Sequence, residues 1–333
     1  MKQQMPGWLG HFDDPYGIVW RASNLIRRVS LRRTCKFLQS YVRYPKFKRP
    51  VFVLGVPRSG TTMVFKLLSA SSQLGSVGRE GHDIWRTYHH PRYTGWRSDH
   101  VGRGVVKPGE RRFINAFLYA YVGRQRLVEK TPENSLRVPY LLDLFPDAVF
   151  VVVWRNPCDV INSLINGWRH PKGHFRSYFV PEDLHIPDYP HRRRWSFTLI
   201  DGWRNYRASS IPEIAFAQWA QATEALVAAR GLIRQDQLLE IFLEDLIATP
   251  QQVLIQICRH VGIEKESLLE SELTRLIENP VNALSLPRAK KWQTENREAI
   301  LALAPRIAPL AAQAAYQIDP ATGDCTLLRQ HPL

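Results

Sequence analysis

The chain has 333 residues, with 45 Lys and Arg against 30 Asp and Glu, and a formal net charge of +15. No apolar run approaches the ~20 residues that a membrane-spanning helix needs, and we expect no secretory signal because the first residues lead into charge. Four cysteines stand far apart without metal-ligand spacing, which predicts free thiols in a reducing, cytoplasmic compartment: Cys35, Cys158, Cys258 and Cys325.

The N-terminal segment, residues 1–49, is a basic lead-in. Residues 1–50 hold eleven Lys and Arg against Asp13 and Asp14. Part of it resembles a basic amphipathic helix, with Arg27, Arg28, Arg32, Arg33 and Lys36 among Ile26, Val29, Leu31, Phe37 and Leu38. Two interpretations stay open: peripheral contact of residues 1–50 with an anionic membrane, or a solvated helix packed on the domain.

The stretch from Val51 to Thr62 carries the strongest signal. An apolar run predicts a strand at about 51–55, and a loop of small residues leads into a helix at about 60–71. Such a loop turns backbone N–H groups inward beside a helix N-terminus, which suits a phosphate. The glycine spacing is that of a Walker A loop, but Thr61 stands in place of its lysine and Arg58 is the loop's cation. This favours one terminal phosphate over the β- and γ-phosphates of ATP.

The hexapeptide of this loop resembles the 5′-phosphosulfate loop of the sulfotransferases that use 3′-phosphoadenosine 5′-phosphosulfate (PAPS). It is closest to the branch with the tyrosylprotein and many bacterial enzymes. The resemblance implies a P-loop-like three-layer α/β/α fold with a central parallel sheet. It also implies in-line transfer without a metal, with 3′-phosphoadenosine 5′-phosphate (PAP) as product. The implied donor-binding residues of the loop are Pro57, Arg58, Ser59, Gly60, Thr61 and Thr62.

Residues 72–125 are irregular in pattern, apart from a helix near 110–122. Glu80 lies 22 residues after Arg58 and matches the position of the catalytic glutamate in that branch. The resemblance implies that Glu80 takes the acceptor's proton. His82 is a rival base because an imidazole titrates near neutral pH. A salt-bridging Glu80 without a catalytic role is the third possibility.

A second strand is predicted at 126–129, with a helix at 133–144. Lys130 follows this strand and matches the lysine-containing segment of the same branch. By this resemblance Lys130 and Arg58 stabilise the leaving group. The alternative is a lysine paired with Glu129 or Glu133.

The clearest buried strand is predicted at 148–154, followed by a helix from Pro157 to about Gly167. Arg155 stands where a Walker B strand would place a magnesium-binding aspartate. An arginine repels a metal and attracts a phosphate. With Ser163 eight residues on, the segment resembles the family's 3′-phosphate motif. The alternative is a strand-end arginine paired with Asp159.

Residues 168–212 interrupt the alternation of predicted strands and helices, and they resemble no recognised segment. We expect an insertion that forms an acceptor pocket or lid. A zinc site at His170 and His174 is disfavoured because Pro171 and Gly173 oppose a helix there. The Trp- and Arg-rich stretches could stack nucleic-acid bases, but we expect no nucleic-acid partner.

The C-terminal part is predicted to contain helices at 213–230, 250–261, 266–278 and 295–316 and a strand at 238–242. Lys290, Lys291 and Trp292 resemble the family's Lys-Trp loop, which closes over the donor near its 3′-phosphate. Leu243 replaces the family's usual adenine-contacting tyrosine. Alternating strands and helices predict a parallel sheet that binds ligands at its carboxyl edge. The sulfotransferase domain is predicted at 50–320, with a tail at 321–333.

Together these features favour a PAPS-dependent sulfotransferase. Its expected partner is a hydroxyl acceptor, whether small molecule, glycan, lipid or peptide. Two alternatives stay open: a P-loop kinase or nucleotidase using ATP and Mg²⁺, and a basic protein that binds nucleic acid or membrane.

Overall fold

The computed structural model describes residues 31–171, 175–280 and 289–328. The predictions for Arg27, Arg28 and His174 therefore lie outside the described residues. The described residues divide into two compact units: those within 31–46 and 107–124, and those within 47–106 and 125–328.

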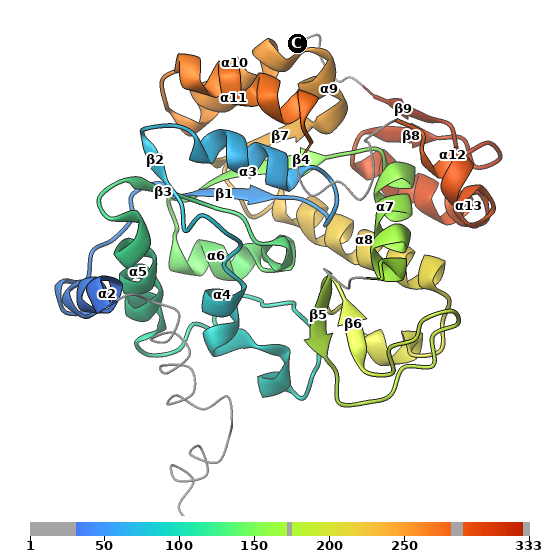
Figure 1. Cartoon of the computed structure of the whole chain (residues 1–333), viewed down its shortest axis with the longest axis horizontal. Helices are drawn as coiled ribbons and strands as arrows, with labels where there is room; N and C mark the ends of the chain where they lie inside the picture. Colours follow the sequence, from blue (N-terminus) through green and yellow to red (C-terminus); the bar gives the residue numbers. More distant parts are fainter. Residues whose placement is uncertain (1–30, 172–174, 281–288, 329–333) are drawn as a thin grey trace, which may run out of the picture. The chain divides into compact units, whose positions relative to one another are not determined.

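The larger unit is built on five parallel strands in the order β2-β3-β1-β4-β7 (Figure 1). This confirms the predicted α/β class with a central parallel sheet. Apolar runs form the strands because each strand is covered on both faces. Their bounds are β1 Val51–Leu54, β2 Leu74–Gly75, β3 Arg126–Glu129, β4 Val149–Trp154 and β7 Leu238–Phe242. Of these, only the two-residue β2 escaped prediction.

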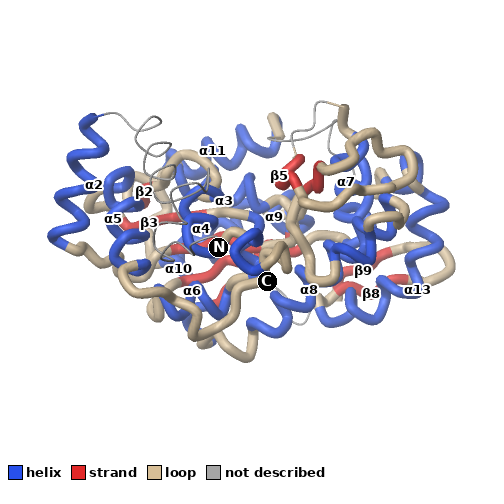
Figure 2. The backbone as a smooth tube through the Cα atoms, turned by 90° about the horizontal axis from the view of Figure 1, so that it is seen from below, coloured by secondary structure: helices blue, strands red, loops and turns tan. Residues whose placement is uncertain are grey.

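Helices cover both sides of this sheet, and Figure 2 shows the strands running between them. The helices of the larger unit are α3 Thr61–Ser69, α4 His82–His89, α6 Val138–Leu144, α7 Pro157–Arg169, α8 Ile211–Ala229, α9 Leu243–Ala248, α10 Pro250–Val261, α11 Ser267–Glu278, α12 Trp292–Glu295 and α13 Arg297–Gln313. Short 3₁₀ turns are η1 Pro91–Thr94, η2 Pro132–Leu136, η3 Trp203–Tyr206 and η4 Gln235–Gln237. Two antiparallel hairpins join β5 Arg176–Phe179 to β6 Arg194–Ser196, and β8 Tyr316–Ile318 to β9 Cys325–Leu327.

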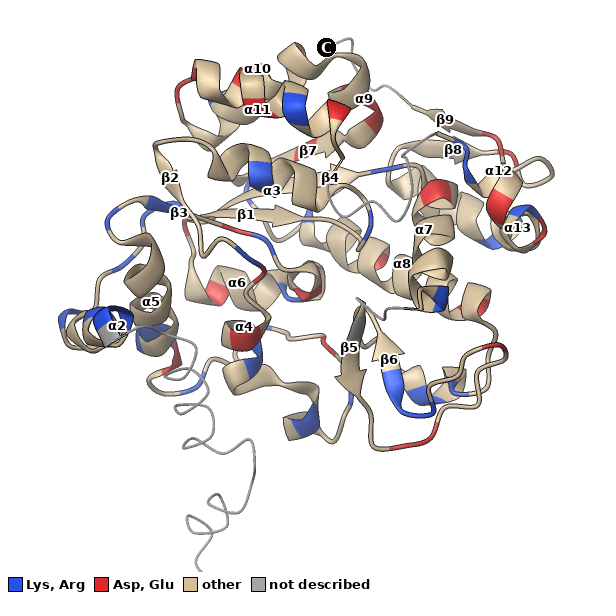
Figure 3. Ribbon diagram, in the orientation of Figure 1, with Lys and Arg blue, Asp and Glu red and all other residues tan. Residues whose placement is uncertain are grey.

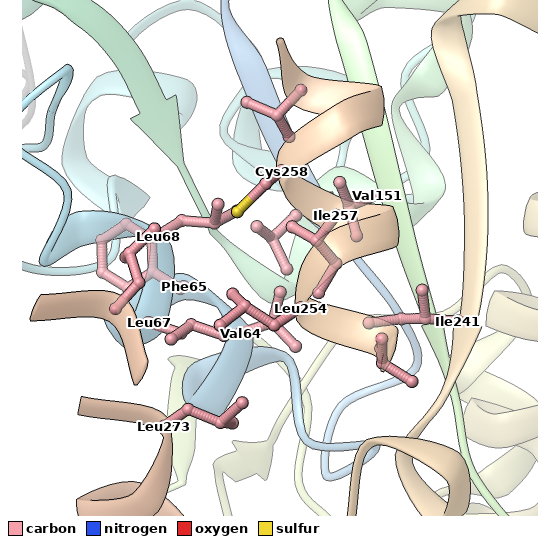
Figure 4. Close-up of a cluster of buried hydrophobic side chains, with 14 of the residues drawn as sticks. Val64, Phe65, Leu67, Leu68, Val151, Ile241, Leu254, Ile257, Cys258 and Leu273 are labelled. Atoms are coloured by element: carbon pink, nitrogen blue, oxygen red, sulfur yellow. The ribbon is translucent and has the colours of Figure 1, made fainter. Parts of the chain in front are cut away.

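Alternate residues of the strands supply two separate cores. On one face, Val51 and Val151 pack with buried side chains of α3, α10 and α11 (Figure 4). On the other face Phe52 stacks on Phe150, with ring centroids 5.8 Å apart, and also contacts Trp85. Because both faces are sealed, polar groups that follow the strands gather at the sheet's carboxyl edge.

Two helix predictions are corrected. The helix expected at 133–144 is instead the 3₁₀ turn η2 followed by α6, which starts with Pro139 near its first position. The last helix ends at Gln313 rather than residue 316, because Ala315 adopts a left-handed backbone (φ 62°) and Tyr316 begins β8.

The smaller unit pairs two helices, α2 Leu31–Arg43 and α5 Glu110–Val122. Phe37 of α2 meets Phe113 of α5 edge to face, with centroids 5.5 Å apart. The predicted helix near 110–122 is confirmed. Within the described residues, no helix combines the length and apolar character needed to cross a bilayer.

Candidate active site

The loop between β1 and α3 is closed by two glycines. A Cβ on Gly55 would lie 2.5 Å from Ser59 Oγ and 2.7 Å from the Val153 carbonyl oxygen, so only glycine fits. Gly60 has a φ of 100°, and a Cβ there would lie 2.9 Å from Leu243 Cδ1. Leu243 thus lies over the loop, at the position where the family usually has a tyrosine. The loop ends on the N-terminus of α3, whose first N–H groups lack intrahelical partners.

Two serines, one outside the loop and one within it, are buried at this turn. Ser135 accepts a hydrogen bond from the Gly55 N–H (3.1 Å) and donates one to the Gly55 carbonyl (2.7 Å). Ser59 is 1 % exposed, yet its hydroxyl has no hydrogen-bond partner among the described residues. A buried hydroxyl of this kind normally has a partner. Together with the two tight glycines, it fits a loop that closes around an anion.

Three predicted donor-binding residues meet at this loop. Arg58 Nε donates to Ser163 Oγ at 3.1 Å, and Arg155 Nη1 donates to the Arg58 carbonyl at 3.0 Å. The Arg58 guanidinium also lies over the Phe175 ring, 4.8 Å from its centroid. The residues predicted for the two anion sites therefore lie next to one another, linked through Arg58.

Arg58 has a pKa lowered to about 10, first by burial and then by the positive charge of Arg155. Glu80 opposes this change. Two guanidinium groups held close together favour binding of a multiply charged anion, which would remove their mutual repulsion. Arg155 therefore contacts the loop, and among the described residues its charge acts on Asp159 without a direct ion-pair contact.

Lys130 contacts the end of the loop where α3 begins. Its Nζ donates to Thr62 Oγ1 at 3.1 Å and also to Glu80 Oε1. Among the described residues, neither Glu129 nor Glu133, the two alternative partners, forms an ion pair with this ammonium group. One cation thus links the first turn of α3 to the predicted base.

Glu80 belongs to a chain of charged side chains that runs from the partly exposed Glu80 and His82 to the buried Glu133. Its second oxygen, Oε2, lies 2.8 Å from His82 Nε2, and His82 Nδ1 lies 2.9 Å from the Glu133 carboxylate. Arg86 of α4 also donates to Glu133. Both nitrogens of His82 are therefore committed to carboxylates, so His82 is poorly suited to accept a proton from an acceptor.

The charges of this chain stabilise one another. Burial alone would raise the pKa of Glu80, but the His82 hydrogen bond and the Lys130 charge lower it to about 2. Burial alone would lower the pKa of His82, but Glu133 and Glu80 raise it to about 9. At neutral pH Glu80 is ionised and His82 is protonated.

The Lys290–Trp292 turn is held against the start of α7. Asp159 Oδ2 accepts the Lys290 N–H at 3.1 Å. Burial raises the pKa of Asp159, and the Arg155 charge opposes this. The lysine side chains face surface carboxylates: Lys290 Nζ lies 2.9 Å from Asp324, and Lys291 Nζ lies 3.3 Å from Glu295.

Trp292 is buried, with 1 % of its surface exposed. Its ring lies against Gly323, where an added Cβ would be 2.6 Å from Cη2. Within the described residues, no group of three or more His, Cys, Asp or Glu side chains could hold a metal.

The contacts of Ser135, and those of Arg86 and His82 with Glu133, are not predicted by the sequence. Glu133 was considered only as a partner for Lys130, which lies three residues away. Its link to His82 spans 51 residues, and no local pattern could have found it. The one relevant feature of the sequence is that Lys130 and Glu133 both follow the end of the same strand.

Comparisons with known proteins identify the family of the chain. A family model described as "Sulfotransferase family" matches residues 50–267. The chain is 30 % identical over 129 residues to a "Putative protein-tyrosine sulfotransferase" of Caenorhabditis briggsae, covering 36 % of this chain and 44 % of the relative. It is 29 % identical over 139 residues to the nodulation protein NoeE of Sinorhizobium fredii, covering 36 % and 32 %. The chain therefore spans less than half the length of these curated relatives.

Two solved structures share the fold. Sulfotransferase STF9 from Mycobacterium avium superposes with a TM-score of 0.58 at 16 % identity, covering 88 % of this chain and 83 % of that one. Sulfotransferase STF1 from Mycobacterium tuberculosis gives 0.51 at 19 % identity, covering 73 % and 76 %.

Proposed function

Because the chain belongs to the sulfotransferase family, we propose that it moves a sulfuryl group from PAPS to a hydroxyl acceptor. The observation that carries this proposal is the meeting of Arg58, Arg155 and Ser163 beside a loop whose buried Ser59 hydroxyl lacks a partner among the described residues. The acceptor class stays open among small molecules, glycans, lipids and peptides.

The loop residues fit the 5′-phosphosulfate. Gly55 and Gly60 leave room only for backbone, and the N-terminus of α3 favours negative charge. Ser59 Oγ supplies a further donor, and Thr61 and Thr62 complete the first turn. PAPS supplies the sulfuryl group, and PAP departs. Arg155 and Ser163 suit the 3′-phosphate because a guanidinium forks onto phosphate oxygens and a hydroxyl adds one donor.

Glu80 is the proposed base. It takes the proton of the acceptor hydroxyl, whose oxygen attacks sulfur as the bond from sulfur to the phosphate oxygen breaks. Lys130 and Arg58 lie where they can neutralise the charge that grows on that oxygen. As Lys130 turns toward the leaving oxygen, its hydrogen bond to Glu80 Oε1 breaks. The pKa of Glu80 then rises from about 2. The carboxylate becomes more basic at the moment that a proton is transferred.

His82 acts as a positioning residue in this scheme. It touches Glu80 Oε2 on one side and Glu133 on the other. As an imidazolium it keeps Glu80 ionised and fixes the orientation of the carboxylate. Lys290 and Lys291 keep their predicted role at the 3′-phosphate only if their side chains leave Asp324 and Glu295.

No step of this scheme needs a metal. We also propose that the enzyme works in the cytoplasm, where free thiols such as Cys35 remain reduced.

The test is sulfate transfer from PAPS labelled with ³⁵S into a panel of phenols, sugars, lipids and tyrosine peptides. The expected result is a labelled sulfate ester whose yield is unchanged by EDTA. Labelled ester formed only when Mg²⁺ is present, or phosphate transfer from ATP·Mg with no sulfate transfer, would favour the P-loop kinase or nucleotidase instead.

A further inference from the structure

The smaller unit carries an unbalanced charge on its surface. Its described residues include nine exposed Lys and Arg and a single carboxylate, Glu110, which is fully buried. Glu110 accepts the Lys107 N–H at 2.7 Å and so serves the start of α5. The exposed cations are Arg32, Arg33, Lys36, Arg43, Lys46, Lys107, Arg111, Arg112 and Arg124. Figure 3 marks Lys and Arg along α2 in blue, with no red on that helix.

Helix α2 has one face that packs on α5. Phe37 meets Phe113, the Arg33 guanidinium lies 4.6 Å from the centroid of the Tyr121 ring, and Arg112 reaches the Tyr41 ring. This agrees in part with the interpretation of a helix packed on the domain. It does not account for the rest of the helix surface.

The other face exposes large apolar side chains. Leu38 is 58 % exposed and Val42 is 80 % exposed, and a spacing of four residues places them one above the other. Cys35 is exposed one turn before Leu38. Arg32, Lys36 and Arg43 flank this strip on the same side of the helix, judged by the rotation of 3.6 residues per turn. The apolar strip thus has cations along one of its edges.

A strip of this kind matches an anionic bilayer surface. Apolar side chains enter the boundary between headgroups and acyl chains, while flanking Lys and Arg meet the lipid phosphates. A nucleic acid would use the cations but would leave Leu38 and Val42 in water. The cations would also attract an acidic protein. Charge attraction alone, however, does not explain binding at a narrow strip of two aliphatic residues.

We propose that the outer face of α2, made of Cys35, Leu38 and Val42 with Arg32, Lys36 and Arg43 beside them, docks on an anionic phospholipid surface. The helix lies parallel to the bilayer plane. This inference goes beyond sulfuryl transfer and does not depend on it, because no residue of the strip belongs to the proposed active site.

The test is co-sedimentation of the full chain with vesicles of phosphatidylcholine containing 30 % phosphatidylserine, and with vesicles of phosphatidylcholine alone. Binding is expected only to the anionic vesicles and should weaken as salt rises. The double variant Leu38→Ser/Val42→Ser should bind at least about tenfold more weakly. The matched control, Ile247→Ser/Leu268→Ser, removes two similarly exposed aliphatic side chains of the larger unit and should bind like the wild type.

A second readout uses the exposed thiol of Cys35, labelled with an environment-sensitive fluorophore in a Cys325→Ser background. Insertion should shift its emission to the blue on anionic vesicles. The proposal is overturned if the double variant binds these vesicles as well as the wild type. It is also overturned if the probe's emission shifts without vesicles as protein concentration rises, which would indicate a second copy bound to the strip. Full competition by duplex DNA, with normal DNA binding by the double variant, would overturn it as well.

Discussion

Arg155 is the residue that we propose recognises the 3′-phosphate of the donor. Its side chain reaches the loop through the Arg58 carbonyl at 3.0 Å. A charge-assisted contact with phosphate is worth about 1.5–3 kcal/mol. We predict that Arg155→Ala weakens PAPS binding about 10- to 100-fold and weakens adenosine 5′-phosphosulfate, which lacks the 3′-phosphate, far less.

Competition binding with the two nucleotides measures this difference. Arg234→Ala serves as the control, since Arg234 is exposed and pairs with Asp236 in the same turn. Equal losses for both nucleotides would remove the assignment of Arg155 to the 3′-phosphate.

Glu80 is predicted to act in the chemical step and not in donor binding. Glu80→Gln keeps the shape of the side chain but cannot accept the acceptor's proton. We expect kcat to fall about 10²- to 10⁴-fold while the affinity for PAP stays within a few-fold. Steady-state kinetics and PAP titration separate the two effects. A variant with normal kcat would show that the acceptor loses its proton to another group.

His82 gives the reaction its expected pH dependence. The pKa of His82 is raised to about 9, chiefly because Glu133 and Glu80 outweigh the effect of burial. Arg86 also faces it and opposes the rise. Because His82 keeps its proton below this pKa, the imidazolium is present below about pH 9 and is lost above it. Activity should therefore decline as pH rises through about 9.

The variant His82→Gln should lower kcat with little change in the KM for PAPS, and its alkaline decline should disappear. The surface variant His100→Gln, which removes a partner of Asp201, should keep the wild-type profile. An unchanged alkaline decline in His82→Gln would assign it to another group.

At the scale of elements, the turn from β1 into α3 depends on the absence of a side chain at Gly55. An alanine there would place its Cβ 2.5 Å from Ser59 Oγ and 2.7 Å from both Thr61 Cγ2 and the Val153 carbonyl oxygen. Backbone cannot yield as a flexible side chain can. We predict that Gly55→Ala lowers the free energy of unfolding by about 1–3 kcal/mol and abolishes measurable PAP binding.

Gly102→Ala is the matched control, because an added Cβ there meets nothing within 4 Å. Chemical denaturation and PAP titration of both variants compare the effects. A Gly55→Ala protein that binds PAP normally would mean that the loop tolerates a different backbone path.

The same scale shows why some elements could be predicted and others could not. The strands β1, β4 and β7 are apolar runs bounded by turns, and their burial on both faces leaves that mark in the sequence. Helix α4 buries only Ile84 and Trp85, so its eight residues carry no helical period. The final helix was extended too far because alanines continue to Ala315, where the backbone turns left-handed.

At the scale of the whole molecule, the sequence could predict which residues approach one another only through the topology of a parallel sheet. Arg58 and Arg155 both follow neighbouring strands, β1 and β4, so their meeting follows from the carboxyl-edge rule. The links from Glu80 through His82 to Glu133 depend on how α4 and η2 fold over that edge. They join segments with no common pattern, which is why His82 looked like a free base in the sequence.

The central claim is that this edge binds a nucleotide phosphorylated at both its 5′ and 3′ positions. Calorimetric titration with PAP in the presence of EDTA, set against titration with ATP·Mg, tests it most directly. The account predicts one PAP site whose affinity EDTA does not change, and ATP·Mg binding weaker by about two orders of magnitude, equivalent to losing about 2.7 kcal/mol of phosphate contacts. Tighter binding of ATP·Mg, or PAP binding that EDTA abolishes, would contradict it.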